Sequence, residues 1–172
     1  MPTDFGFRFS TYLALGLACA TLGYSEFGYL PSVTAFTVAV LGMMVVAFRR
    51  DGRNEISLAT ANRVGLVIGI AVIAYLAFQF FRPGVSLLDR MPFPAGLLPY
   101  LGPVFLVLIP AKLFRPKHVG DWWAMHGVGL AVVCLACVME DDTPLAVLVT
   151  AYLVVGVWSL MLFYFQIGRA HV

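Results

Sequence analysis

Three side chains in one uncharged run of this sequence, residues 122–139, have the chemistry for redox or proton transfer. Cys134 and Cys137 have the spacing of a thioredoxin-type pair. That reaction needs a thiolate of low pKa within reach of solvent, whereas both cysteines lie deep in apolar sequence. His126 has no second histidine in the run to complete a haem or metal site. We predict that the cysteines are small packing residues and that His126 makes a hydrogen bond within a helix bundle. Redox or metal function is the weaker alternative.

The charged residues before this run form a short basic turn that contains Lys112, Arg115 and Asp121. A charged side chain costs about 2.5–3.5 kcal/mol at the centre of a bilayer, so we expect this turn at a membrane boundary. There Lys112 can pair with Asp121 across the turn. The Asp121 carboxylate is also favoured at the N-terminus of a helix. The pattern predicts a structural clasp, with contact to a partner as the alternative.

An acidic turn, Glu140-Asp141-Asp142, follows the same run. We predict a solvated tip at which Asp142 or Thr143 caps the next helix, with Pro144 in its first turn. Cation binding at this tip is the alternative.

The composition favours lipid rather than water as the main solvent. Hydrophobic residues make up 61% of the 172 residues and charged residues 12%, against roughly 45–50% and about 25% in soluble domains. A net charge of +2, spread over loops, argues against a nucleic-acid partner. The alternation that a membrane β-barrel needs is absent. We therefore predict an all-α, polytopic membrane helical bundle with the lipid bilayer as its partner.

Six uncharged runs are long enough for transmembrane helices. We expect the last two, joined by the acidic turn, to form the hairpin around which the chain is organised. The run that starts at Phe9 is interrupted by Thr and Gly and is the weakest, and the proline-containing fourth run predicts a bent helix. The predicted helices span about 9–27, 31–48, 63–81, 95–113, 121–139 and 143–166. A lead at 1–8 precedes them, and a tail at 167–172 suggests truncation or foreign sequence.

The distribution of Lys and Arg predicts the orientation, because cytoplasmic loops are enriched in both. With six spans, the side of the N-terminus carries nine of the 11 basic residues and the opposite side carries two. The nine are Arg8, Arg49, Arg50, Arg53, Arg63, Lys112, Arg115, Lys117 and Arg169, and the two are Arg82 and Arg90. Both termini are therefore expected to be cytoplasmic. Trp122, Trp123 and Trp158 are the predicted interface anchors.

The uncharged runs contain no internal Asp, Glu, Lys or Arg, and Glu26 marks a tight connection at the end of the first predicted helix. Ion-coupled transporters generally place such groups inside the bundle. The sequence also lacks a P-loop, a dinucleotide-binding fingerprint, an HExxH motif and a Gly-x-Ser-x-Gly motif. We predict no catalytic, cofactor-binding or metal-binding residues in this chain.

The segment from Lys112 to Tyr164 resembles the N-terminal membrane region of bacterial membrane-anchored transglutaminase-like proteins. The matching positions are Lys112, Leu113, Asp121, Trp158, Leu160 and Phe163. The chain departs from the family pattern where Arg115 stands near the position of the usual Glu and Gly120 stands in place of an Arg.

The resemblance implies a multi-pass protein of the bacterial inner membrane. It also implies an extracytoplasmic domain with a papain-like Cys, His and Asp triad, which these residues do not contain. We expect a non-catalytic membrane anchor and assembly module whose partners are lipid and that further domain. A small transporter or channel-like protein is the alternative. The sequence predicts no oligomeric state.

Overall fold

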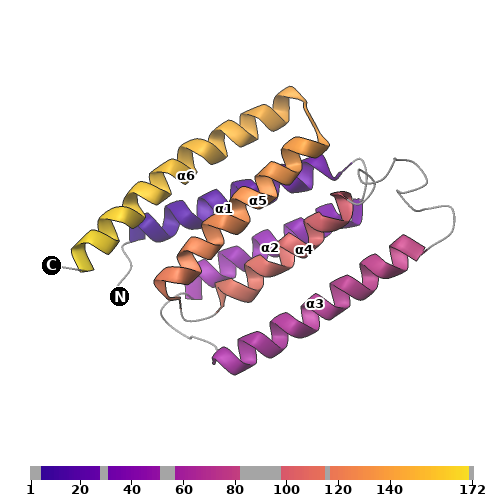
Figure 1. The fold of residues 1–172 in the computed structure, drawn as a ribbon, viewed down its shortest axis with the longest axis horizontal. Helices are drawn as coiled ribbons and strands as arrows, with labels where there is room; N and C mark the ends of the chain where they lie inside the picture. The colour runs from indigo at the N-terminus through magenta and orange to yellow at the C-terminus, as the bar shows by residue number, and fades with distance from the viewer. Residues whose placement is uncertain (1–4, 28–30, 51–56, 82–97, 115–116, 171–172) are drawn as a thin grey trace.

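The structure, a computed structural model, describes residues 5–27, 31–50, 57–81, 98–114 and 117–170, and the regular secondary structure of these residues is all α-helix (Figure 1). The helices are α1 (Phe5–Ser25), α2 (Pro31–Arg50), α3 (Leu58–Phe81), α4 (Leu98–Leu113), α5 (Val119–Met139) and α6 (Thr143–Ala170).

Four of these helices, α1, α2, α5 and α6, are long and apolar enough to cross a membrane. The remaining two contain shorter apolar segments, Asn62–Phe78 in α3 and Leu98–Leu113 in α4. The all-helical class predicted from the sequence is therefore confirmed, whereas the count of clear membrane-spanning candidates is four rather than six.

The helix bounds differ from the predicted ones mainly at the ends. Helix α1 begins at Phe5, inside the predicted polar lead, and α6 continues to Ala170, inside the predicted tail. The first residues predicted for the fourth helix, 95–97, lie outside the described residues. Both Pro103 and Pro110 lie within α4, as the tolerance of prolines in bundled apolar helices allows.

Polar side chains mark where several helices begin. The Ser57 hydroxyl accepts a hydrogen bond from the Thr60 N–H (3.2 Å) just before α3. Similarly, Asp142 Oδ1 accepts the Leu145 N–H (3.0 Å) at the start of α6. Such caps satisfy N–H groups that lack a carbonyl partner in the first turn. The predicted capping residue Asp142 is thus found at the N-terminus of α6.

The centre of the bundle is α1 and not the predicted α5–α6 hairpin. Helix α1 packs against α2, α5 and α6, whereas α5 and α6 touch each other little. Gly23 allows α1 and α2 to approach closely, since a Cβ at this position would lie 2.9 Å from Thr37 Cγ2. The expectation that the hairpin organises the chain was wrong, because sequence neighbours need not be packing neighbours.

The more polar helix is inside and the more apolar helix is outside. Helix α1 buries hydroxyl side chains, and those of Ser10, Thr21 and Ser25 donate to carbonyls of α1 itself. Helix α6 instead exposes many large apolar side chains, including Val154 and Tyr164. Lipid tails are as apolar as Leu, so burial of the most apolar helix gains nothing in a bilayer.

Helix α3 lies at the edge of the bundle and packs chiefly on α4 (Figure 1). Large apolar side chains on α3 are exposed, among them Leu66, Val67, Ile70, Ile73 and Phe78. A water-soluble protein rarely exposes so continuous an apolar surface. This helix is therefore suited to contact with lipid.

Candidate functional site

One end of the bundle is basic, and we call it the basic end: α1 and α5 begin there, and α2 and α4 end there. Lys112 Nζ donates a hydrogen bond to Asp121 Oδ1 at 2.7 Å. The second carboxylate oxygen, Oδ2, accepts the His118 backbone N–H at 3.2 Å. Asp121 is buried, so the ammonium and the N–H compensate a charge that burial alone would destabilise. Arg115, the third residue of the predicted clasp, lies outside the described residues.

Aromatic rings lie close to two further cations of the basic end, Lys117 and Arg8. Lys117 Nζ lies 5.5 Å from the centre of the Trp122 ring and 5.9 Å from that of Tyr12. Arg8 donates to the Phe48 carbonyl (3.0 Å), and its guanidinium stands 5.4 Å from the Phe48 ring centre. These distances are suitable for cation–π attraction.

The three tryptophans have two different surroundings. Trp123 and Trp158 are exposed on the outside of the bundle. Trp122 is only 4% exposed, and its ring meets that of Phe7 edge-on at 4.9 Å. Trp122 therefore belongs to the core between α1 and α5, and an interface anchor on this helix would have to be Trp123.

His126 is part of a chain of hydrogen bonds that joins three helices. Its Nδ1 lies 2.9 Å from the Trp122 carbonyl oxygen, and its Nε2 lies 3.0 Å from Ser159 Oγ of α6. Ser159 Oγ lies 2.8 Å from Thr11 Oγ1 of α1. Because a carbonyl only accepts, Nδ1 must carry the proton. In the neutral ring, Nε2 then accepts from Ser159, and the single hydroxyl proton of Thr11 is shared between Ser159 Oγ and the Phe7 carbonyl oxygen, which lies 3.0 Å from Thr11 Oγ1.

The cysteines have no such partners in the part of the chain that the structure describes. Cys134 and Cys137 are exposed on α5, and Cys19 is buried in the core. No group of three or more His, Cys, Asp or Glu residues that could hold a metal ion occurs among the described residues.

The opposite end of the bundle, which we call the acidic end, joins α1 to the α5–α6 turn. The Tyr24 hydroxyl donates to Asp142 Oδ2 there. The Asp142 carboxylate thus has both oxygens engaged, one by Tyr24 and one by the Leu145 N–H. This fixes Asp142 as a structural residue of the predicted tip.

Glu26 lies at the same end of the bundle, and its burial was not expected from the sequence. It follows the apolar helix Phe5–Ser25 by one residue, is fully buried, and has no hydrogen-bond partner for either carboxylate oxygen among the described residues. Its carboxyl group lies against α4, where a Cβ at Gly102 would overlap it. The apolar span Phe5–Ser25 itself contains no acid, but the tight connection after α1 turns Glu26 inward, so the bundle has a buried carboxyl group that the sequence did not indicate.

The surroundings of Glu26 disfavour its charged form. Burial raises its pKa from 4.5 to about 8. The hydroxyl oxygen of Thr37, which lies on α2 close to Gly23 of α1, is also buried and has no hydrogen-bond partner in the described part of the chain. The sequence carries one signal for this site, a small residue at 102 on another helix, but nothing in the sequence pairs it with residue 26.

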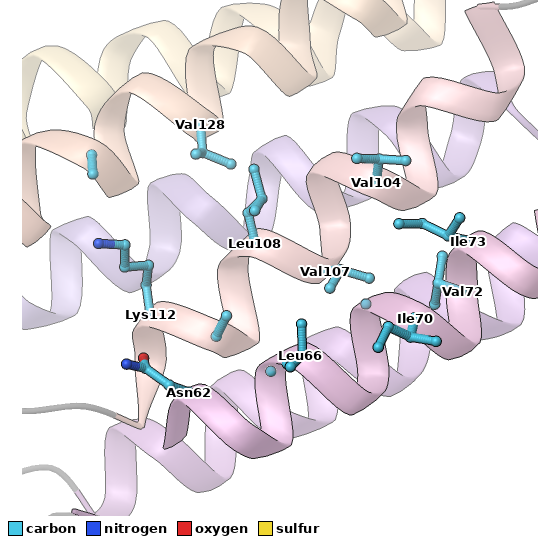
Figure 2. A pocket seen from close by; sticks show the side chains of 14 residues that line it. Asn62, Leu66, Ile70, Val72, Ile73, Val104, Val107, Leu108, Lys112 and Val128 are labelled. Carbon is cyan, nitrogen blue, oxygen red and sulfur yellow. The ribbon is translucent and has the colours of Figure 1, made fainter. Parts of the chain in front are cut away.

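A hollow of about 500 Å³ opens on the side of the bundle between α3, α4 and α5 (Figure 2). We call it the lateral groove. Its walls are apolar except at the basic end, where Asn62 and Lys112 lie (Figure 2).

No protein family, curated protein or solved structure matches this chain.

Proposed function

We propose that this chain is a non-catalytic membrane anchor and assembly module, the N-terminal part of a larger transglutaminase-like protein of the bacterial inner membrane. The observation that carries the proposal is that the polar and charged side chains of the described residues bond to one another between helices. Lys112 and Asp121 close the turn between α4 and α5. His126, Ser159 and Thr11 join α5, α6 and α1. These groups hold helices together, and Lys112 is the one among them that also lines the lateral groove between α3, α4 and α5.

The arrangement in the membrane is part of the same proposal. Six crossings with both termini in the cytoplasm would place the basic end in the cytoplasm, in agreement with the nine-to-two distribution of Lys and Arg. The exposed apolar surface of α3 supports its role as one of the two further crossings. Helix α4 would be the other, with its prolines shielded by α2, α3 and α5.

The experiment that tests the anchor function begins with the coding sequence beyond codon 166. We expect a seventh span and then an extracytoplasmic domain with Cys, His and Asp. Deletion of residues 5–170 together with that seventh span should release the domain from the membrane fraction. A stop codon after 172, or a domain that stays in the membrane fraction without these helices, would contradict the proposal.

A small transporter is the second candidate, and the observation that favours it is Glu26. A buried carboxyl group in a membrane bundle is by default a hypothesis of function, since proton relays use such groups. Proteoliposomes that contain the purified chain and a trapped pH indicator test this reading. Proton entry that is lost in Glu26→Gln would favour the transporter, and equal leakage in empty and loaded vesicles would exclude proton transport.

A further inference from the structure

The lateral groove has the dimensions of a ligand site. A volume of about 500 Å³ falls within the roughly 300–1,000 Å³ of small-molecule sites. It runs along α3 and α4, and Leu66, Ile70, Val107 and Leu108 turn their side chains toward it (Figure 2).

Water and a further helix are poor occupants of the lateral groove. A hollow with apolar walls has no partners for water and stays dry. A helix about 11 Å wide displaces about 500 Å³ in each turn of 5.4 Å, so the groove holds about one turn of helix and not a span. A flexible hydrocarbon chain is thinner and can follow the gap between α3 and α4.

The polar end of the lateral groove indicates what chemical group is attached to the hydrocarbon chain. Lys112 Nζ has three N–H donors, of which the Asp121 pair uses one. Its side chain is 33% exposed, so the ammonium can reach a second anion. Asn62 adds amide donors at the same end (Figure 2). Arg63, exposed beside Asn62 on α3, adds a further positive charge that attracts anionic headgroups.

We propose that the lateral groove binds one acyl chain of an anionic phospholipid, with the headgroup phosphate held at Lys112 and Asn62. Charge complementarity and the slender apolar hollow together identify this occupant. Such binding rests on the helices belonging to a membrane protein, but it is compatible with an anchor and with a transporter alike.

Gly69→Leu tests the acyl-chain part of the site. Gly69 lines the lateral groove, and a Cβ there would meet nothing within 4 Å, so a larger side chain can enter the groove without displacing the backbone. Gly156→Leu on α6 is the matched control, because its Cβ position is equally open and lies outside the groove. The probe is phosphatidylglycerol, with phosphatidylcholine of identical chains as reference, and native mass spectrometry in detergent counts the lipids bound per protein.

We expect wild type and Gly156→Leu to retain one phosphatidylglycerol in preference to phosphatidylcholine, and Gly69→Leu to lose it. Retention that Gly69→Leu leaves unchanged would place the lipid elsewhere, for example in the smaller hollow of about 260 Å³ between α1 and α2. The proposal would be overturned by any of three outcomes: retention that Gly69→Leu leaves unchanged, retention of neither lipid by the wild-type protein, or a protein dimer without bound lipid.

Asn62→Asp tests the headgroup part. It keeps the size of the side chain and adds a negative charge beside Lys112, so we expect affinity for phosphatidylglycerol to fall about tenfold, the order expected for one charge-assisted hydrogen bond. Thr60→Asp, on the same helix and outside the groove, adds the same charge and should leave affinity within about twofold. Equal affinity of the wild-type protein for the two lipids would contradict the proposed binding of an anionic headgroup at Lys112 and Asn62. Loss of membrane anchoring by the longer protein with lipid retention intact would sink the anchor function alone.

Discussion

At the scale of single residues, Glu26 has the most unusual position in this protein. A carboxyl group buried without a partner is kept neutral, and burial raises the pKa of Glu26 to about 8. An unfolded chain ionises the same group near 4.5. Between these values the folded protein binds more protons, so stability falls as pH rises from about 4.5 to about 8 and is level outside that window.

The prediction is that purified protein in detergent loses thermal stability over this pH range, by a few kcal/mol at about 1.4 kcal/mol per pKa unit. Glu26→Gln removes the titrating group, so its stability should be nearly independent of pH. Thermal unfolding is monitored by tryptophan fluorescence. Glu140→Gln at the same end of the bundle is the control and should keep the slope of the wild type. A slope that survives in Glu26→Gln would show that another group is responsible.

The chain from His126 to Thr11 leads to a second prediction at this scale. Ser159→Ala leaves His126 Nε2 and the Thr11 hydroxyl without their shared partner inside the bundle. The expected loss in unfolding free energy is about 1–3 kcal/mol, the cost of an unsatisfied buried polar group. Thermal denaturation measures it. Thr150→Val on the same helix is the control, since its exposed hydroxyl bonds only the Ala146 carbonyl of its own turn. Equal melting temperatures of wild type and Ser159→Ala would contradict a structural role for the chain.

Single residues also show the limit of the sequence. Lys112 and Asp121 are nine positions apart, and a turn between two helices can hold only nearby positions together, so this pair could be predicted. Ser159 and Thr11 are separated by 148 positions, and their contact depends on which helices are neighbours. Hydropathy carries no information on that choice, because every helix is apolar.

At the scale of helices, the contact between α4 and the turn that follows α1 depends on Gly102. A Cβ there would overlap the Glu26 carboxyl group, so Gly102→Ala must push the acid or the helix aside. Overpacking of this kind typically costs about 1–3 kcal/mol. We predict that this cost largely disappears in a Glu26→Ala background, as measured by a double-mutant cycle of unfolding free energies.

Gly42→Ala on α2 is the matched control for Gly102→Ala. A Cβ at residue 42 would meet nothing within 4 Å, so this change should be neutral or slightly stabilising, since Ala favours the helix. If Gly102→Ala were equally destabilising in the wild-type protein and in the Glu26→Ala variant, the two positions would not be in contact.

The helices themselves were predictable, but their order of burial was not. Apolar runs of sufficient length give helix positions to within a few residues, because a chain in lipid must satisfy its backbone internally. The run judged weakest, at α1, became the centre because its hydroxyl groups and Gly23 favour contact with protein rather than with lipid. The α5–α6 pair, apolar on nearly all sides, is held instead through α1.

At the scale of the whole molecule, the number of membrane crossings decides how every other feature is placed. Four helices are clear candidates, and α3 and α4 carry shorter apolar segments. Four and six crossings are both even, so both numbers put the two termini on one side. Only the α3–α4 connection distinguishes them: six crossings would place it opposite the termini, and four would place it on the same side.

The last prediction is therefore a labelling experiment on that connection. In a background with Cys19, Cys134 and Cys137 replaced by Ala, single cysteines are introduced as Ser86→Cys between α3 and α4, as Asp141→Cys at the acidic turn, and as Ser57→Cys before α3. A membrane-impermeant maleimide is added to intact cells. Six crossings with cytoplasmic termini predict that residues 86 and 141 react and that residue 57 reacts only after lysis. Labelling of residue 141 but not of 86 would instead leave α3 and α4 as a hairpin that enters from the cytoplasm without crossing. The basic end would still lie at the cytoplasmic headgroup level that its lysines and arginines suit, because α1, α2 and α5 cross in either case, but two walls of the lateral groove would then belong to a hairpin that does not span the bilayer.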